Sequence, residues 1–246
     1  MKSKANIDVF NKEVSTSGVG YLSRSDALLS ARVASNRTYE VLSSEYDFNG
    51  KTVLDVGCGD GKATSDFFSK CRPKYVLGID AAHNAIEYAL RTHSSDGKIE
   101  FMAVNAYDLC EKIDHRFDVG MMLFVLHHLP DPSAAVKEVV KMADTIIIAE
   151  PNGNSPIRKI LERVSKYRIE CEEQSFSAST IKGWFFDAGF RIEKSKYVNC
   201  VPLFCPDWMV GPLKLLEFFV ERVPLLRNLL CGQYILVAIK DSVDGE

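Results

Sequence analysis

The 246-residue sequence has no long hydrophobic run, no marked excess of charge of one sign and no C-x-x-C pair. Lys and Arg number 30 against 33 Asp and Glu, so the formal net charge of −3 argues against a nucleic-acid-coating polycation. No stretch approaches the roughly 18 apolar residues of a membrane span, and the first residues lack the apolar region of a secretion signal. We therefore expect a cytoplasmic protein with no integral membrane segment and no nucleic-acid partner.

The seven cysteines are scattered and odd in number, and no histidine lies near them at the spacing of a zinc site. Such a set is typical of a reduced intracellular protein rather than of a disulfide scaffold. Hydrophobic residues make up 46% of the chain and charged residues 26%, close to the averages of globular domains. A chain of this length can bury a large core, so we expect one domain over residues 1–246.

Short apolar runs alternate with longer amphipathic segments along the chain. The predicted strands are Thr52–Val56, Tyr75–Ile79, Glu100–Val104, Val119–Val125, Thr145–Ala149, Arg191–Val198 and Tyr234–Lys240. The predicted helices are Ala27–Leu42, Gly61–Lys70, Asn84–Thr92, Pro132–Met142, Ser155–Arg168, Ser179–Ala188 and Pro212–Val223. Parallel strands need crossover segments of helical length. The pattern therefore predicts an α/β fold with one sheet covered by helices on both faces.

A glycine-rich loop after the first strand is the strongest local signal. Gly57, Gly59 and Gly61 lie between a buried strand and a helix, where glycine lets a ligand approach the backbone. The helix start adds free N–H groups and the positive end of the helix dipole. A dinucleotide fingerprint would need glycine at the position of Lys62, so the spacing is G-x-G-x-G, preceded by Asp55.

This acid-x-G-x-G-x-G pattern resembles the first motif of the class I S-adenosylmethionine-dependent methyltransferases. The second strand ends in Asp80, where the family has an acid, and Asn105 follows the third strand where the family often has Asp. The segment Phe117–Pro132 resembles the family's fourth strand and the turn after it. The resemblance covers about residues 50–150 strongly and 180–240 loosely.

The resemblance implies a Rossmann-like, seven-stranded, mostly parallel sheet whose last strand is antiparallel. It also implies S-adenosyl-L-methionine as methyl donor, leaving as S-adenosyl-L-homocysteine. The carboxylate of Asp80 would accept hydrogen bonds from the ribose hydroxyls, and Asn105 would accept one from the adenine amino group. Cys58 is expected to be a small packed residue and not a nucleophile, because no activating base is nearby. The expected cofactor-binding residues are Asp55, Gly57, Cys58, Gly59, Asp80, Ala81, Asn105, Ala106 and Leu123.

Two adjacent histidines are the candidate catalytic residues. A base that removes the proton of an acceptor hydroxyl speeds methyl transfer, and the fourth strand brings His127 and His128 towards the reaction centre. The alternative is that these side chains pack or form hydrogen bonds locally. Similar quinone-type O-methyltransferases can carry a Glu-x-x-Glu-His arrangement here, and this chain has Phe124, His127 and His128 instead. We therefore expect no metal.

The favoured function is methyl transfer to a small, partly apolar metabolite, with oxygen preferred over nitrogen or carbon as the accepting atom. The Asn/Asp-Pro-Pro-aromatic motif of amino-group methyltransferases is absent, which argues against nucleic-acid acceptors. One alternative is a binding protein of this fold without catalysis, which the intact Asp55, Gly57, Gly59 and Asp80 disfavour. Another is a nicotinamide-dependent oxidoreductase, which Lys62 disfavours.

The chain divides into an N-terminal helical cap (1–48), a cofactor-binding core (49–150) and a substrate-side half (151–246) with a helical insertion at 199–232. In the family, such an N-terminal extension often closes over the ligands. Tyr21 and Arg24 are therefore candidate contacts. The alternative is a helix that merely covers the sheet edge.

The helical insertion has an amphipathic pattern that permits three roles. It can pack on the sheet or form a homodimer contact, cover an apolar acceptor pocket, or rest on a membrane. The chain itself is expected to be a monomer or a homodimer. Acidic residues on the polar face argue against strong attraction to anionic lipid. The expected apolar face is Leu213, Leu216, Val220 and Val223, and the expected polar face is Lys214, Glu217 and Glu221.

Overall fold

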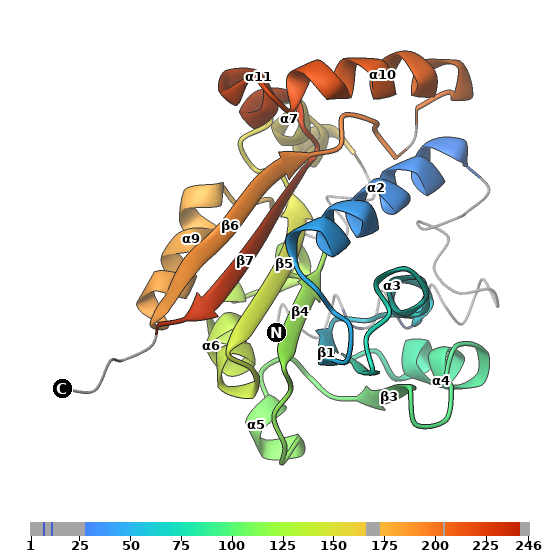
Figure 1. The fold of residues 1–246 in the computed structure, drawn as a ribbon, viewed down its shortest axis with the longest axis vertical. Helices are drawn as coiled ribbons and strands as arrows, with labels where there is room; N and C mark the ends of the chain where they lie inside the picture. The colour runs from blue at the N-terminus through green and yellow to red at the C-terminus, as the bar shows by residue number, and fades with distance from the viewer. Residues whose placement is uncertain (1–6, 8–10, 12–27, 166–172, 204, 242–246) are drawn as a thin grey trace.

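A seven-stranded sheet forms the centre of the computed structural model, which describes residues 7, 11, 28–165, 173–203 and 205–241 (Figure 1). The strand order is β3-β2-β1-β4-β5-β7-β6, and only β7 runs antiparallel to its neighbours. This confirms the predicted Rossmann-like sheet. The strands are β1 (Thr52–Val56), β2 (Tyr75–Asp80), β3 (Ile99–Ala103), β4 (Val119–Leu123), β5 (Thr145–Pro151), β6 (Phe190–Val198) and β7 (Gln233–Lys240).

Helices cover both faces of the sheet, as the sequence predicts. One face carries α2 (Leu29–Glu45), α3 (Lys62–Cys71) and α4 (His83–Thr92). The other face carries α5 (Leu109–Lys112), α6 (Pro132–Met142) and α9 (Ala178–Asp187). At the end of the sheet drawn at the top of Figure 1 lie α7 (Pro156–Val164), α10 (Asp207–Val220) and α11 (Pro224–Leu230). No described helix is long and apolar enough to cross a membrane.

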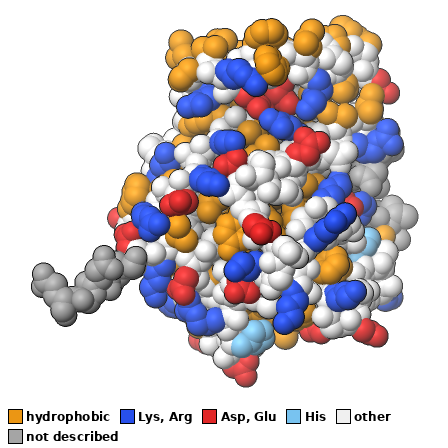
Figure 2. Space-filling model, viewed as in Figure 1, with side chains coloured by type: hydrophobic (Ala, Val, Ile, Leu, Met, Phe, Trp, Pro, Cys, Tyr) orange, Lys and Arg blue, Asp and Glu red, His pale blue; other side chains and the backbone are white. Residues whose placement is uncertain are grey.

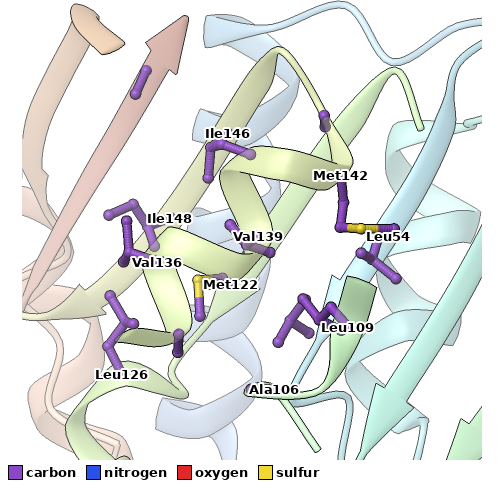
Figure 3. Packing of buried hydrophobic residues seen from close by; sticks show 14 of the residues in the cluster. Leu54, Ala106, Leu109, Met122, Leu126, Val136, Val139, Met142, Ile146 and Ile148 are labelled. Carbon is purple, nitrogen blue, oxygen red and sulfur yellow. The ribbon is translucent and has the colours of Figure 1, made fainter. Parts of the chain in front are cut away.

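The core has two layers because successive side chains of a strand point to opposite faces. Met122 belongs to the cluster that includes α6, whereas its neighbour Met121 belongs to the cluster under α2 and α3. Figure 3 shows Met122 of β4 and Ile148 of β5 beside Val136 and Val139 of α6. All of these side chains are buried, and each is worth about 1.5–3 kcal/mol relative to exposure.

Most predicted element boundaries hold to within a few residues, and the differences have physical reasons. The fourth strand ends at Leu123 and not at Val125, because Phe124 has a φ of 58°. A left-handed backbone cannot continue a strand. Tyr21 and Arg24 lie outside the described residues. The helix predicted to reach Arg168 is shorter than expected: α7 ends at Val164, because Ser165 has an extended backbone.

The prediction of a helix beginning at Pro212 is wrong. The helix α10 begins at Asp207, so Pro212 lies inside it. Proline lacks a backbone N–H and favours the first helical turn, which is why it suggested a start. The second helix, α11, does begin with a proline, Pro224, whose missing N–H costs no helical hydrogen bond there.

The predicted apolar face of the insertion is also wrong in part. Val220 is buried as expected, but Leu216 and Val223 are exposed, and Glu217 is only 4% exposed. A buried carboxylate needs a charged or hydrogen-bonding partner. Compared with the prediction, the helix is therefore rotated about its axis so that its acidic side faces the protein. The groups that pair with these acids explain the rotation.

The partner from outside α10 is Arg37 of α2, and Lys214 of α10 itself also lies 2.8 Å from Oε1 of Glu217. The Nη2 of Arg37 lies 2.6 Å from Oε2 of Glu221, and its Nε lies 3.3 Å from Oε1 of Glu217. The acids also accept backbone N–H groups of the segment after β6: Cys200 N donates to Glu217 at 2.8 Å, and Asn199 N donates to Glu221 at 3.2 Å. The network therefore links α2, α10 and the end of β6.

We predict that Arg37→Met destabilises the protein by about 2 kcal/mol. Breaking a fully buried ion pair costs about 3–5 kcal/mol, and the Arg37 side chain is 27% exposed, which lowers the cost. Urea unfolding measures the loss. The matched control is Arg191→Met, whose pair with Glu193 is exposed and should contribute less than about 1 kcal/mol. Equal losses in both variants would contradict the assigned role.

Candidate active site

The glycine loop between β1 and α3 bends under the end of β2. The N–H groups of Gly57 and Cys58 both donate to the carbonyl of Ile79, at 2.8 and 2.9 Å. Gly57 has a φ of 82°, and a Cβ added there would lie 2.3 Å from Cγ2 of Val125. Glycine is therefore required at this position for both backbone and packing reasons.

Asp80 ends β2 beside this loop. Its Oδ2 accepts the N–H of Gly59 at 3.0 Å, and its Oδ1 accepts the N–H of Ala82 at 2.8 Å. A carboxylate offers about four acceptor positions, so the same group can hold the loop and still accept ribose hydroxyls. The geometry thus brings together the loop and the acid that the sequence analysis assigned to the cofactor.

Asp55 and Cys58, two of the residues expected to bind the cofactor, are both buried. Asp55 is buried, and its Oδ2 accepts the hydroxyl of Thr64 at 2.6 Å, which joins β1 to α3. Burial, together with the carboxylates of Asp80, Asp55 and Asp60, raises the pKa of the Cys58 thiol well above its usual value. A neutral, buried thiol agrees with the packing role expected for Cys58.

The remaining expected cofactor residues lie at the ends of neighbouring strands. Asn105 follows β3, and its Oδ1 accepts the N–H of Tyr107 at 3.2 Å, so the backbone already engages the oxygen expected to meet adenine. Ala106 and Leu123 are buried in the two core layers, and Ala81 is half-buried after Asp80. Their contacts with a cofactor stay predictions.

A buried carboxylate that the sequence analysis missed organises the turn after β4. Oε1 of Glu150, at the end of β5, accepts the N–H groups of Val125 and Leu126 at 2.8 and 2.7 Å. Its Oε2 lies 2.7 Å from Nδ1 of His127. The available signal was an acid at the end of an apolar strand, the same feature that marked Asp80.

The environment of Glu150 favours its protonated form. Burial raises its pKa to about 8, although the backbone N–H groups of Leu126 and Val125 act in the opposite direction. His127 is buried against it, within the short 3-10 helix η2 (Leu126–His128). The pair therefore holds His127 in one orientation, through one ring nitrogen.

The second histidine lies against the first, with the two rings tilted by 40°. The ring centroids of His127 and His128 are 4.0 Å apart. Together with Glu173 they place one potential metal-ligand atom each within 4.8 Å of one another. A guanidinium nitrogen of Arg158 lies 2.9 Å from Oε2 of Glu173 and already supplies that acid with a cation. The expectation of no metal stays a prediction.

The family model and the curated relatives that match this chain are all methyltransferases. Residues 54–144 match a family model described as a methyltransferase domain. The chain is 34% identical over 106 residues to the ubiquinone biosynthesis O-methyltransferase of Neisseria meningitidis serogroup A, covering 42% of this chain and 44% of that protein. It is 36% identical over 155 residues to the protein of that name from Pseudomonas syringae pv. tomato, covering 58% and 66%. The chain thus spans about half the length of the first such relatives.

A solved structure shares the fold over nearly the whole chain. The magnesium protoporphyrin IX methyltransferase of Synechocystis PCC 6803, solved with bound S-adenosylmethionine, has a TM-score of 0.64. The alignment covers 98% of each chain at 16% sequence identity. At that identity the likeness establishes the architecture alone.

We predict that Glu150→Gln flattens the pH dependence of stability. Because the folded chain holds the Glu150 proton up to about pH 8 and the unfolded chain releases it near its ordinary pKa of 4.5, this group's contribution to stability decreases as the pH rises between those values. Glutamine keeps an acceptor for both N–H groups but does not titrate. The variant should therefore gain stability relative to the wild type as the pH rises.

Urea unfolding at several pH values across this window measures the difference between the two proteins. Glu193→Gln is the matched control, since its carboxyl is exposed on β6. A stability difference between wild type and Glu150→Gln that stays constant with pH would contradict the raised pKa of Glu150.

Proposed function

We propose that this chain, a class I S-adenosylmethionine-dependent methyltransferase by its matching domain and its fold, transfers a methyl group to an oxygen atom of a small, partly apolar metabolite. The observation that carries the proposal is the bond between Asp80 and the glycine loop at the carboxyl ends of β1 and β2. In open α/β sheets, ligands bind at this edge. The O-methyltransferase names of the relatives favour oxygen as the accepting atom.

The residues at this edge fit the donor. S-adenosylmethionine supplies a methyl group that its sulfonium already activates, so the protein contributes mainly binding and orientation. Asp80 would bind the ribose hydroxyls, and the glycine loop would lie against the donor with its backbone. Asn105, Ala106, Ala81 and Leu123 complete the set assigned to it, from the ends of β2, β3 and β4.

The histidines and Glu150 would handle the acceptor's proton. When Glu150 is ionised, Nδ1 of His127 donates to it, and Nε2 is the nitrogen able to accept a proton from a hydroxyl. When Glu150 is protonated, it donates to Nδ1 of His127. The imidazole then carries its own proton on Nε2, so Nε2 can no longer accept one. Glu150 is therefore a positioning residue. His127 can be the base while Glu150 is ionised, and His128 is the other candidate base.

The setting is a small-molecule enzyme of the cytoplasm, acting as a monomer or homodimer without a bound metal. The six cysteines among the described residues are all free thiols, which suits a reducing compartment. The insertion (199–232) would flank the acceptor, because it joins the end of β6 to the start of β7 at this edge. The N-terminal cap (1–48) would flank it too, because the start of α2 meets the insertion: the hydroxyl of Ser30 donates to the carbonyl of Leu203 at 2.8 Å.

The first test is calorimetric titration of the purified chain with S-adenosylmethionine, S-adenosylhomocysteine and NADH. We expect micromolar binding of both adenosyl ligands and none of NADH. Asp80→Ala should weaken the binding by about 1.5–3 kcal/mol, since it removes hydrogen bonds to a charged group. Asp187→Ala, an exposed acid at the end of α9, is the control. Binding of NADH alone, or an Asp80→Ala variant of unchanged affinity, would refute the assignment.

A second test separates a catalytic base from a structural histidine. His127→Ala and His128→Ala are assayed for release of S-adenosylhomocysteine with apolar phenols as acceptors. The variant that lacks the base should lose about a hundredfold or more in turnover while its affinity for S-adenosylmethionine stays near wild type. A parallel loss of donor affinity would instead mark that histidine as structural.

A further inference from the structure

Exposed apolar side chains are concentrated on three helices. Of the 18 large hydrophobic residues exposed in the described part of the chain, 13 lie on α7, α10, α11 or the turn between α10 and α11. Single exposed hydrophobic residues are ordinary, but a contiguous group marks an interaction surface. We call these 13 residues the apolar cap: Ile157, Ile160, Leu161, Val164, Trp208, Leu215, Leu216, Phe218, Phe219, Val223, Leu225, Leu226 and Leu230.

The apolar cap forms one continuous layer. Figure 2 shows hydrophobic side chains across the top of the molecule, where Figure 1 places α10 and α11 with α7 below them. Hydrogen bonds join these segments, because Asn154, just before α7, donates through Nδ2 to Oδ1 of Asn228 in α11 at 2.7 Å. Segments distant in sequence therefore present a common face.

The apolar cap lies at the edge of the sheet that carries the candidate active site. The helix α7 follows the carboxyl end of β5, and α11 leads into β7, whose first residue, Gln233, pairs with Pro151 at that end. Glu150, which holds the histidine turn, is the residue before Pro151. The apolar cap and the candidate active site thus lie at the same edge of the sheet. A molecule bound at the cap would be close to the residues proposed for the chemistry.

Cations outnumber acids among the exposed charged residues of these helices. The acids face inward: Glu162 accepts from Arg158 and Ser175, and Glu217 and Glu221 bind Arg37. Three cations, Arg163, Arg222 and Arg227, are exposed, against one exposed acid, Asp207. The other cations of these helices, Arg158, Lys159 and Lys214, are half-buried and pair with the acids. Figure 2 shows Lys and Arg side chains, with Asp and Glu side chains between them, directly beneath the hydrophobic layer. The protein as a whole is slightly acidic, so this basic border is local.

We propose that the apolar cap binds the surface of an anionic phospholipid bilayer. Apolar and aromatic side chains with cations around them are the pattern of helices that lie in the headgroup region. The guanidinium of Arg222 lies 3.5 Å from the ring centroid of Phe218, which places a cation over an aromatic side chain of the cap. The side chains of Glu217 and Glu221 point towards Arg37, so their charges do not face the lipid and do not repel it.

A second copy of the chain fits this surface less well. A two-fold contact would place the basic border of one copy against the basic border of the other. Phosphate headgroups neutralise the same cations. If the proposed function holds, the bilayer is also a source of apolar acceptor, but binding to lipid does not depend on methyl transfer.

Vesicle flotation of the full chain tests the proposal without donor or acceptor. We expect the protein to float with vesicles of phosphatidylcholine mixed with phosphatidylglycerol, and less with phosphatidylcholine alone. Leu215→Gln combined with Leu225→Gln should reduce the bound fraction about tenfold or more, because both side chains are well exposed on the cap. Leu90→Gln combined with Phe186→Gln, exposed on α4 and α9, is the matched control and should bind as wild type.

A charge variant tests the basic border separately. Arg222→Glu with Arg227→Glu should abolish the preference for anionic vesicles, whereas Lys98→Glu with Lys112→Glu, exposed elsewhere, should keep it. Circular dichroism confirms that each variant is folded. The proposal is overturned if the wild type does not float, if both apolar pairs lose binding equally, or if the cap pair only converts a dimer to a monomer. Calorimetry with S-adenosylmethionine on the same protein shows separately whether the proposed function fails.

Discussion

The buried carboxylate of Glu150 is the contact on which the candidate site depends. It binds the N–H groups of Val125 and Leu126 and one nitrogen of His127, so it defines the backbone and the histidine of the turn after β4. Val125 in turn fills the space beside Gly57, where no side chain fits. The glycine loop, the histidine turn and the end of β5 are therefore packed as one unit, and a change in any part affects the other two.

A second charge network decides how the insertion meets the rest of the protein. Because Arg37 draws Glu217 and Glu221 towards α2, the side chains of Leu215, Leu216, Phe218 and Phe219 face away from the core. Burying an ionised acid is unfavourable without a partner, so the position of one arginine sets the rotation of a whole helix. The same rotation exposes the part of the apolar cap that lies on α10 and turns Glu217 and Glu221 inward.

Local patterns in the sequence predicted most of the fold. Strands such as Val53-Leu-Asp-Val56 are short apolar runs bounded by turn residues, and the segments between them have helical length and period. The glycine spacing and the acid at Asp80 predicted a ligand-binding edge, and the structure brings these groups within hydrogen-bonding distance. These features are readable because each depends on residues close together in the chain.

What the sequence by itself determined is therefore the order of the elements, the class of the fold and the loop that would receive an adenosyl ligand. Only the tertiary structure decided that Glu150 meets His127, that Glu217 is buried and that Pro212 lies inside a helix. The physical reason is that the period of a helix reports which residues share a face, but not which face turns inward. That choice depends on partners such as Arg37, which is 180 residues away from Glu217 along the chain.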